Sequence, residues 1–171
     1  MGVGEPTLMR SGIAHEGRLA VRVRFVGNPG NASLPEGGRT SLHAMGRAIA
    51  LCADEADRFA LAGRRIDGFT PPYTTMQVGL ASGGSILNII PEHAQFDVEW
   101  RNVPGDEGAE EFLKLQNTLA SLDEDLRKNN PEGGICYLQL VDLPPLVLPA
   151  DHLLTEITCQ ITGRNSPGMV S

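Results

Sequence analysis

Between residues 18 and 141 the apolar residues switch repeatedly between a period of two and spacings of three and four, and the order of these switches constrains the fold. A period of two predicts a half-buried strand, whereas spacings of three and four predict an amphipathic helix. The expected strands and helices alternate in the order strand, helix, strand, strand, helix, strand, over residues 18–26, about 39–62, 75–80, 85–102 with an interruption, 106–128 and 135–141.

This order predicts an α+β fold of the ferredoxin-like, split βαβ type. Such a fold has a four-stranded antiparallel sheet with both helices on one face. Charged residues support the expected helix ends, because Arg64 and Arg65 follow the first helix and Asp106 is a suitable N-cap for the second. We expect this sheet domain to span residues 16–142.

The two ends of the chain do not fit into the sheet domain. Residues 1–15 precede it, and residues 143–171 contain one short helical segment, 151–162, after a Pro-Pro pair. A length of 171 residues supports one domain with parts of a second. We therefore expect the sheet domain to be cut out of, or inserted into, a larger protein, with 1–15 and 143–171 as strips of the other domain.

Composition excludes several classes of partner. The net charge is −7, whereas nucleic acids and anionic membranes need clustered Lys and Arg. No run of about 18 apolar residues predicts a membrane span. Cys52, Cys136 and Cys159 form no Cys-x-x-Cys motif, and their apolar neighbours predict buried free thiols. These features predict a cytoplasmic protein that binds neither nucleic acid nor membrane.

The chain lacks the motifs of a self-contained enzyme. Its four histidines form no His-x-His, His-x-x-x-His or His-x-Asp spacing, so they predict no zinc site of their own. Neither a Gly-x-Ser-x-Gly nucleophile motif nor a glycine-rich phosphate loop is present. Each histidine is typical of a surface or helix-end position.

Two residues near the third strand could bind a carboxylate. Asn88 interrupts an apolar run that looks buried, and a buried amide needs hydrogen-bond partners. Arg101 ends the strand and could hold a carboxylate with two parallel hydrogen bonds. Simpler interpretations stay open, because Asn88 could stabilise the Gly83-Gly84 turn and Arg101 could be an exposed arginine beside Glu99.

Several linked motifs are similar to those of a known enzyme family. In chain order they are Gly4-Glu5-Pro6-Thr7, Ala14-His15-Glu16-Gly17-Arg18, Ser33-Leu34-Pro35, Gly83-Gly84-Ser85, Asn88-Ile89-Ile90-Pro91 and Arg101-Asn102-Val103-Pro104-Gly105-Asp106. They resemble the zinc amidohydrolases and peptidases that include acetylornithine deacetylase, succinyl-diaminopimelate desuccinylase, aminoacylase and carboxypeptidase G. The resemblance covers nearly the whole chain, and the last motif is most similar to acetylornithine deacetylase.

The resemblance implies a two-domain parent enzyme that uses a two-zinc site to hydrolyse N-acyl amino acids, with a role in arginine biosynthesis. This chain is similar to its ferredoxin-like lid, which forms homodimers in many members through the first helix and a sheet edge. The family's metal-ligand glutamate corresponds to Glu5, which on composition alone would be a solvated acid. The lid residues that contact the substrate carboxylate correspond to Asn88 and Arg101.

The chain also departs from the family. It has no His-x-Asp segment, bridging aspartate, Glu-Glu pair or C-terminal histidine ligand, which the family needs to activate a metal-bound water. Asn31 stands where the family has a histidine that stabilises the oxyanion, and an amide can donate a hydrogen bond but cannot become cationic. We therefore expect an inactive fragment without stoichiometric zinc.

Two other functions stay open at this stage. The first is a stand-alone ferredoxin-like module that binds a small molecule or regulates another protein. The second is a purely structural dimer.

Overall fold

The computed structural model describes residues 12–34, 38–128, 130–149, 151–163 and 168–170. The elements, in chain order, are β1 (Gly12–His15), β2 (Gly17–Val26), β3 (Gly30–Asn31), α1 (Ser41–Ala62), β4 (Thr75–Gly83), β5 (Ile89–Ile90), β6 (His93–Asn102), α2 (Gly108–Arg127), β7 (Gly134–Leu143), β8 (Leu146–Val147), α3 (Leu153–Thr162) and β9 (Gly168–Val170).

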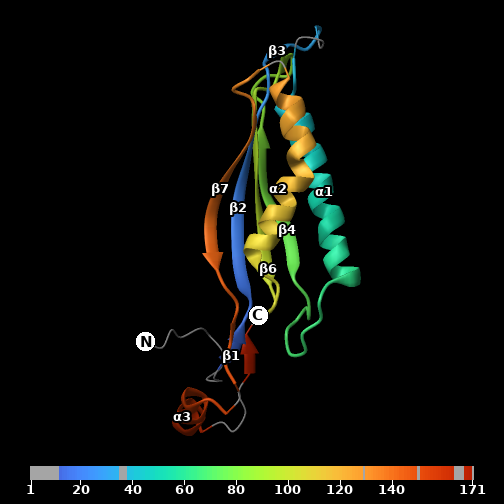
Figure 1. Ribbon diagram of the computed structural model, residues 1–171. Helices are drawn as coiled ribbons and strands as arrows, with labels where there is room; N and C mark the ends of the chain where they lie inside the picture. The colour runs from blue at the N-terminus through green and yellow to red at the C-terminus, as the bar shows by residue number, and fades with distance from the viewer. Residues whose placement is uncertain (1–11, 35–37, 129, 150, 164–167, 171) are drawn as a thin grey trace.

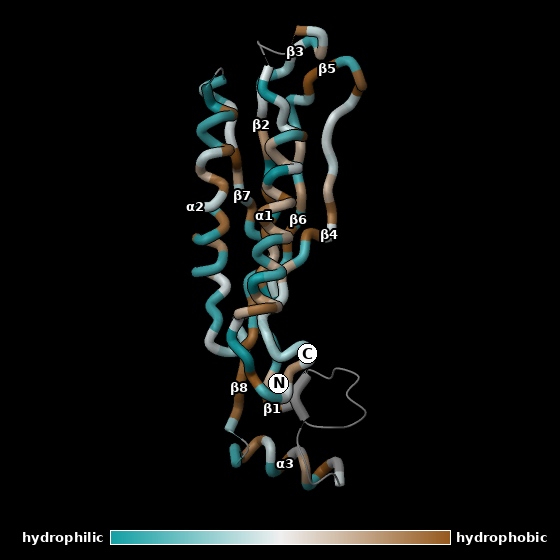
Figure 2. The backbone as a smooth tube through the Cα atoms, turned by 90° about the vertical axis from the view of Figure 1, so that its right-hand side faces the viewer, coloured by the Kyte–Doolittle hydropathy of each residue, from teal (hydrophilic) through white to brown (hydrophobic). Residues whose placement is uncertain are grey.

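The main sheet has four strands in the order β4-β6-β2-β7, and every neighbouring pair is antiparallel. Helices α1 and α2 run along one face of this sheet (Figure 1). Helix α1 packs against β4 and α2 against β7, as the turned view in Figure 2 also shows. This arrangement confirms the predicted ferredoxin-like α+β fold.

The core lies between the sheet and the two helices because the strands alternate as predicted. Val21, Val23 and Phe25 of β2 are fully buried beneath the helices, and Trp100 of β6 lies on the same face. Leu119 on α2 closes the layer from above. Burying such side chains contributes about 1.5–3 kcal/mol each, so this layer supplies much of the folding free energy.

The prediction of one interrupted strand over 85–102 is correct for 93–102 and wrong for the residues before it. Gly84 adopts a left-handed backbone with φ of 75°, and the chain leaves the sheet there. The short strand β5 then pairs with β3 instead, with Gly30 opposite Ile90. Only β6, beginning at His93, belongs to the main sheet, so the tip of the domain is a separate two-stranded ladder.

The charged residues at the helix ends follow the prediction in part. Arg65 donates hydrogen bonds to the carbonyl oxygens of Phe59 and Gly63 and so satisfies the C-terminal end of α1. Arg64 instead pairs with Asp106 at 3.1 Å. The N-cap of α2 is Glu107 and not Asp106. The Asp106 carboxylate instead accepts hydrogen bonds from Thr74 and Arg64.

The cysteines correct another expectation. Cys52 on α1 is buried as predicted, but Cys136 is exposed and Cys159 is only partly buried. Cys136 lies opposite Arg24 on the sheet face that carries no helix, where an apolar neighbourhood in the sequence does not mean burial in the fold.

A second, smaller sheet lies at the end of the domain opposite the β3–β5 tip (Figure 1). In it β1 pairs antiparallel with β8 and parallel with β9. Helix α3 lies near this small sheet, past the end of the main sheet, in both views (Figure 2). Residues 12–15 therefore pair with the C-terminal part of the chain rather than with the four-stranded sheet.

Candidate functional site

The structure brings two of the predicted site residues together at the tip. Asn31 ends β3, Asn88 precedes β5, and the backbone N–H of Ala32 donates to the carbonyl oxygen of Asn88 at 3.1 Å. Asn31 pairs with Ile89, so Asn88 is one residue away from the position opposite Asn31 along the ladder. Glu5, the predicted metal ligand, lies outside the described residues.

Asn31 is oriented by its own turn. Its side-chain oxygen accepts hydrogen bonds from the backbone N–H of Ser33 at 3.0 Å and from the Ser33 hydroxyl at 2.9 Å. With the oxygen occupied, the NH₂ group is the part of this exposed side chain that can donate to a ligand. This polarity suits stabilisation of an oxyanion.

Asn88 lies in an exposed loop, so the prediction that it lies in a buried run is wrong. Leu87 is fully exposed, and Ile86 and Ile89 are 59% and 41% exposed. Within the described part of the chain the Asn88 side chain makes no hydrogen bond, and water or a ligand can satisfy it. The amide therefore does not stabilise the glycine turn, which was its simpler interpretation.

Arg101 lies at the opposite end of the main sheet, on the face without helices. Its side chain is 45% exposed, and its Nε donates to Glu99 at 2.7 Å. Arg18 of β2 lies directly opposite Arg101 and donates to the same carboxylate, with Nε at 2.8 Å. Two guanidinium groups therefore share one acid, which leaves this cluster of three with one net positive charge.

The electrostatics of this end reflect that sharing. Burial alone would raise the pKa of Glu99, but hydrogen bonds from Arg18 and Arg101 outweigh it and hold that pKa below its ordinary range. Glu16 lies close enough to feel the charge of Arg101, and partial burial raises the pKa of Glu16 above its ordinary range. Glu99 thus stays ionised and fixes both arginines in place.

Asn88 and Arg101 do not meet within one chain. Ala94 of β6 pairs with Gly83 near the tip, whereas Arg101 pairs with Thr75 at the other end. Strand β6 rises by about 3.3 Å per residue, so the eight steps from His93 to Arg101 span roughly 26 Å. A single chain cannot grip one small carboxylate with both side chains.

Arg18 is part of a family motif but was not predicted from the sequence as a site residue. The alternation of residues 18–26 puts Arg18 on the outward face, which is the signal that could have found it. Its position opposite Arg101 depends on the register of β2 against β6, which periodicity does not specify.

The described residues contain no group of three or more His, Cys, Asp or Glu that could hold a metal ion. In that same part of the chain, no helix has the length and apolar character needed to cross a membrane.

Comparisons with solved structures extend the fold assignment. The chain superposes on aminopeptidase PepT from Bacillus cereus with a TM-score of 0.67 at 19% identity, covering 94% of this chain and 39% of that one. It superposes on an amidase of the hydantoinase/carbamoylase family from Burkholderia vietnamiensis with a TM-score of 0.66 at 17% identity, covering 93% and 36%. At these identities the likeness shows the fold alone.

Sequence relatives are more specific. An acetylornithine deacetylase from Myxococcus xanthus is 31% identical over 132 residues, which cover 75% of this chain and 33% of the relative. The enzyme of the same name from Photorhabdus laumondii is 28% identical over 167 residues, covering 96% and 41%. The chain thus spans well under half the length of these relatives. The family model of the peptidase dimerisation domain matches residues 13–129, and the chain therefore belongs to the peptidase dimerisation domain family.

Proposed function

We propose that this chain is the substrate-gripping lid and dimerisation domain of a metal-dependent hydrolase of N-acyl amino acids, similar to acetylornithine deacetylase. Residues 16–142 would form the lid, with 1–15 and 143–171 as strips of the catalytic domain. The pairing of β1 with β8 and β9, outside the main sheet, supports these boundaries. Zinc as the metal, arginine biosynthesis as the pathway and the cytoplasm as the location are parts of the same proposal.

The observation that carries the proposal is the cluster of Arg18, Glu99 and Arg101. It lies at the end of the main sheet from which the chain crosses into the β8-β1-β9 sheet, where a catalytic domain would begin. Both guanidinium groups are partly exposed and are held by an ionised carboxylate. A rigid pair of planar donors with a net positive charge is suited to a substrate carboxylate.

A homodimer would bring the separated residues together. Strand β4 is an edge of the main sheet, and sheet edges can pair with a second chain. A two-fold axis perpendicular to the sheet and just outside the middle of the β4 edge makes the two copies of β4 antiparallel, so the Gly83 end of one lies beside the Thr75 end of the other. The tip that carries Asn31 and Asn88 then faces the Arg101 end of the partner.

The metal would be held mainly outside this chain. The described residues do not offer a ligand set, so the rest of the parent enzyme must supply it. In the assembled protein this domain would bind and orient the substrate, with Arg101 on its carboxylate and the Asn31 amide donating to the oxyanion of the attacked acyl group.

Carboxylate recognition can be tested on the 171-residue chain by NMR. N-acetyl-L-ornithine should shift the Arg101 side-chain Nε–Hε signal, and its methyl ester, which lacks the carboxylate charge, should bind at least about tenfold more weakly. Arg101→Lys should lose a similar factor because an ammonium group cannot make the two parallel hydrogen bonds. Arg24→Lys, an exposed arginine on the same sheet face, is the matched control. Equal binding of acid and ester would overturn the proposed grip.

A further inference from the structure

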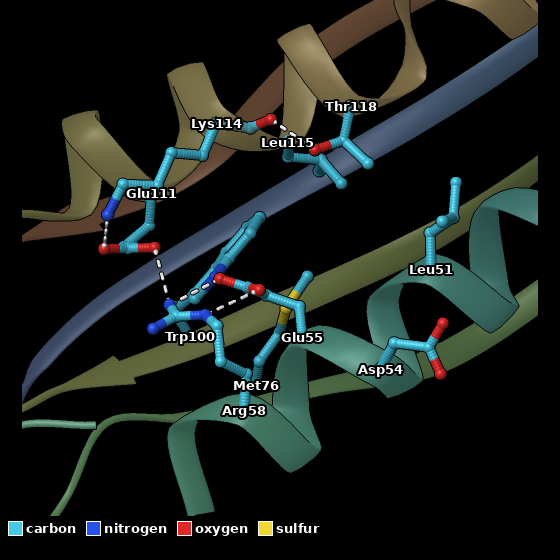
Figure 3. A pocket seen from close by; sticks show the side chains of 10 residues that line it. All are labelled: Leu51, Asp54, Glu55, Arg58, Met76, Trp100, Glu111, Lys114, Leu115 and Thr118. Atoms are coloured by element: carbon cyan, nitrogen blue, oxygen red, sulfur yellow. Dashed lines mark hydrogen bonds and ion pairs between the residues drawn. The ribbon is translucent and has the colours of Figure 1, made fainter. Parts of the chain in front are cut away.

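A groove of about 560 Å³ lies between α1 and α2 on the helical face of the sheet (Figure 3). Its apolar walls come from Leu51 on α1 and Leu115 on α2, and Met76 and Trp100 of the sheet lie beneath it. Volumes of this order accommodate a small organic ligand. Neither the fold nor the proposed lid function requires this opening.

A buried carboxylate faces the groove from α2. The Glu111 side chain is only 7% exposed, and its Oε1 accepts a hydrogen bond from Lys114 at 2.6 Å. Its Oε2 is buried and accepts no hydrogen bond from the residues that the structure describes. Arg58 Nη2 lies 3.9 Å from this oxygen, which is too long for a hydrogen bond. A buried acceptor without a donor is unfavourable, so Oε2 can accept a hydrogen bond from an N–H group.

The neighbouring charges do not fill that position. Arg58 is already hydrogen-bonded to Glu55, because its Nε and Nη2 donate to that carboxylate at 2.8 and 2.5 Å. Figure 3 shows the Arg58 guanidinium between Glu55 and Glu111, closer to Glu55. Five charged side chains line the groove: the acids Asp54, Glu55 and Glu111, and the bases Arg58 and Lys114. One negative charge therefore remains unbalanced. Both the hydrogen bonding and the charge therefore favour a cationic donor.

We propose that this groove binds a small organic cation, with a primary ammonium group donating to Glu111 Oε2 and an apolar chain lying along Leu115 and Met76. An organic cation fits better than a metal ion because the described residues form no three-ligand group there. The site is independent of the proposed substrate grip. Trp100 faces the helices, whereas Arg101, the next residue of β6, faces the opposite side of the sheet.

The groove would stay open in the proposed dimer. Helix α1 packs over the β4 edge and α2 over β7, so the space between the helices lies toward the middle of the sheet. A second chain that pairs along β4 approaches from the outer side of α1 (Figure 2).

Trp100 is the only tryptophan of the sequence and lies beneath the groove, so its fluorescence can report on binding. The 171-residue chain would be titrated with n-hexylammonium chloride, with 1-hexanol and with sodium hexanoate, which share an apolar chain and differ in head-group charge. We expect a saturable change with hexylammonium and binding at least about tenfold weaker for the alcohol and the carboxylate. Equal or tighter binding of either, or no saturable change with hexylammonium, would overturn the proposal.

A matched pair of variants tests the acceptor itself. Glu111→Gln removes the charge with little change in shape and should weaken hexylammonium binding about tenfold. Glu110→Gln alters the exposed neighbouring acid and should leave binding unchanged. Unchanged affinity in a folded Glu111→Gln chain, checked by circular dichroism, would contradict the assignment. If that variant did not fold, the three-ligand comparison on the unaltered chain would still decide the question.

Discussion

Two cysteines show how the position of a single residue sets its chemistry. Cys52 is buried in the core, where burial raises the pKa of its thiol to about 12. A thiol with such a pKa is almost entirely protonated at neutral pH and is a poor nucleophile. Cys136 lies exposed on the open face of the sheet.

We therefore expect iodoacetamide to alkylate Cys136 in the native chain and Cys52 only after denaturation. Peptide mapping by mass spectrometry distinguishes the two sites. Adding a denaturant before the reagent is the control that makes both thiols accessible. Equal rates of native labelling at both residues would contradict the burial of Cys52.

The pair of Arg22 and Asp97 predicts a dependence of stability on pH. Arg22 donates to both oxygens of Asp97, at 2.7 and 2.8 Å, and these hydrogen bonds hold the pKa of Asp97 below its ordinary range. The unfolded chain has an Asp pKa of about 3.9, so the pair stabilises the fold above that value. The contribution is lost as the pH falls through the lower pKa of the folded state.

When the pH is lowered from about 6 to about 2, the free energy of unfolding should therefore fall less for Asp97→Asn than for the unaltered chain. Urea denaturation at each pH measures this difference. Asp67 is exposed, and Asp67→Asn is the control that should retain the full difference. A pH dependence of Asp97→Asn as steep as that of the unaltered chain would show that the pair is not responsible.

At the scale of the elements, α2 is held by one buried stripe. Leu119 is fully buried against the sheet, whereas Leu113 on the same helix is 57% exposed. Leu119→Ala should lower the free energy of unfolding by about 2–5 kcal/mol, because it removes buried apolar surface and leaves a cavity. Leu113→Ala should change it by less than about 1 kcal/mol. Chemical denaturation of both variants checks the contrast, and similar losses would contradict the assigned faces.

The long elements could be predicted because each has a clear period over many residues. Strand β2 and helix α1 were expected within a few residues of their observed bounds. The segment around Ile86 could not be predicted, because a short apolar run is equally compatible with a buried strand and an exposed loop. Asp106 was expected as an N-cap, but its tertiary partners Thr74 and Arg64 are far away in the sequence.

The candidate site was harder to predict than the fold. Arg101 and Asn88 were found as residue types, but their separation depends on the turn at Gly84 and on the pairing of β5 with β3. Arg18 joins Arg101 only through the register of two strands that are far apart in the chain. The periodicity of a strand predicts which face of the sheet a residue occupies. It does not predict which residue of the neighbouring strand lies opposite it.

At the scale of the whole molecule, the proposed dimer can be tested at the β4 edge. Leu80 is 67% exposed and lies beside the middle of β4, so in a two-fold pairing it lies close to its own copy. Leu80→Glu would place two carboxylates near each other and should weaken dimerisation by about tenfold or more. Light scattering over a concentration series measures the effect.

Leu140→Glu changes an exposed leucine on β7, the opposite edge of the sheet, and is the matched control. It should leave the dimer intact. If Leu140→Glu weakened the dimer and Leu80→Glu did not, the interface would lie at the β7 edge and the proposed β4 interface would be wrong.

The distance between Asn88 and Arg101 also has a genetic consequence for the proposed parent enzyme. If each active site combines Arg101 of one chain with Asn88 of the other, a pure dimer of either Asn88→Ala or Arg101→Ala chains has both sites damaged. In a mixed dimer of the two variants, one active site carries both substitutions and the other active site carries neither. Two alleles that are each inactive should therefore complement one another when expressed in the same cell.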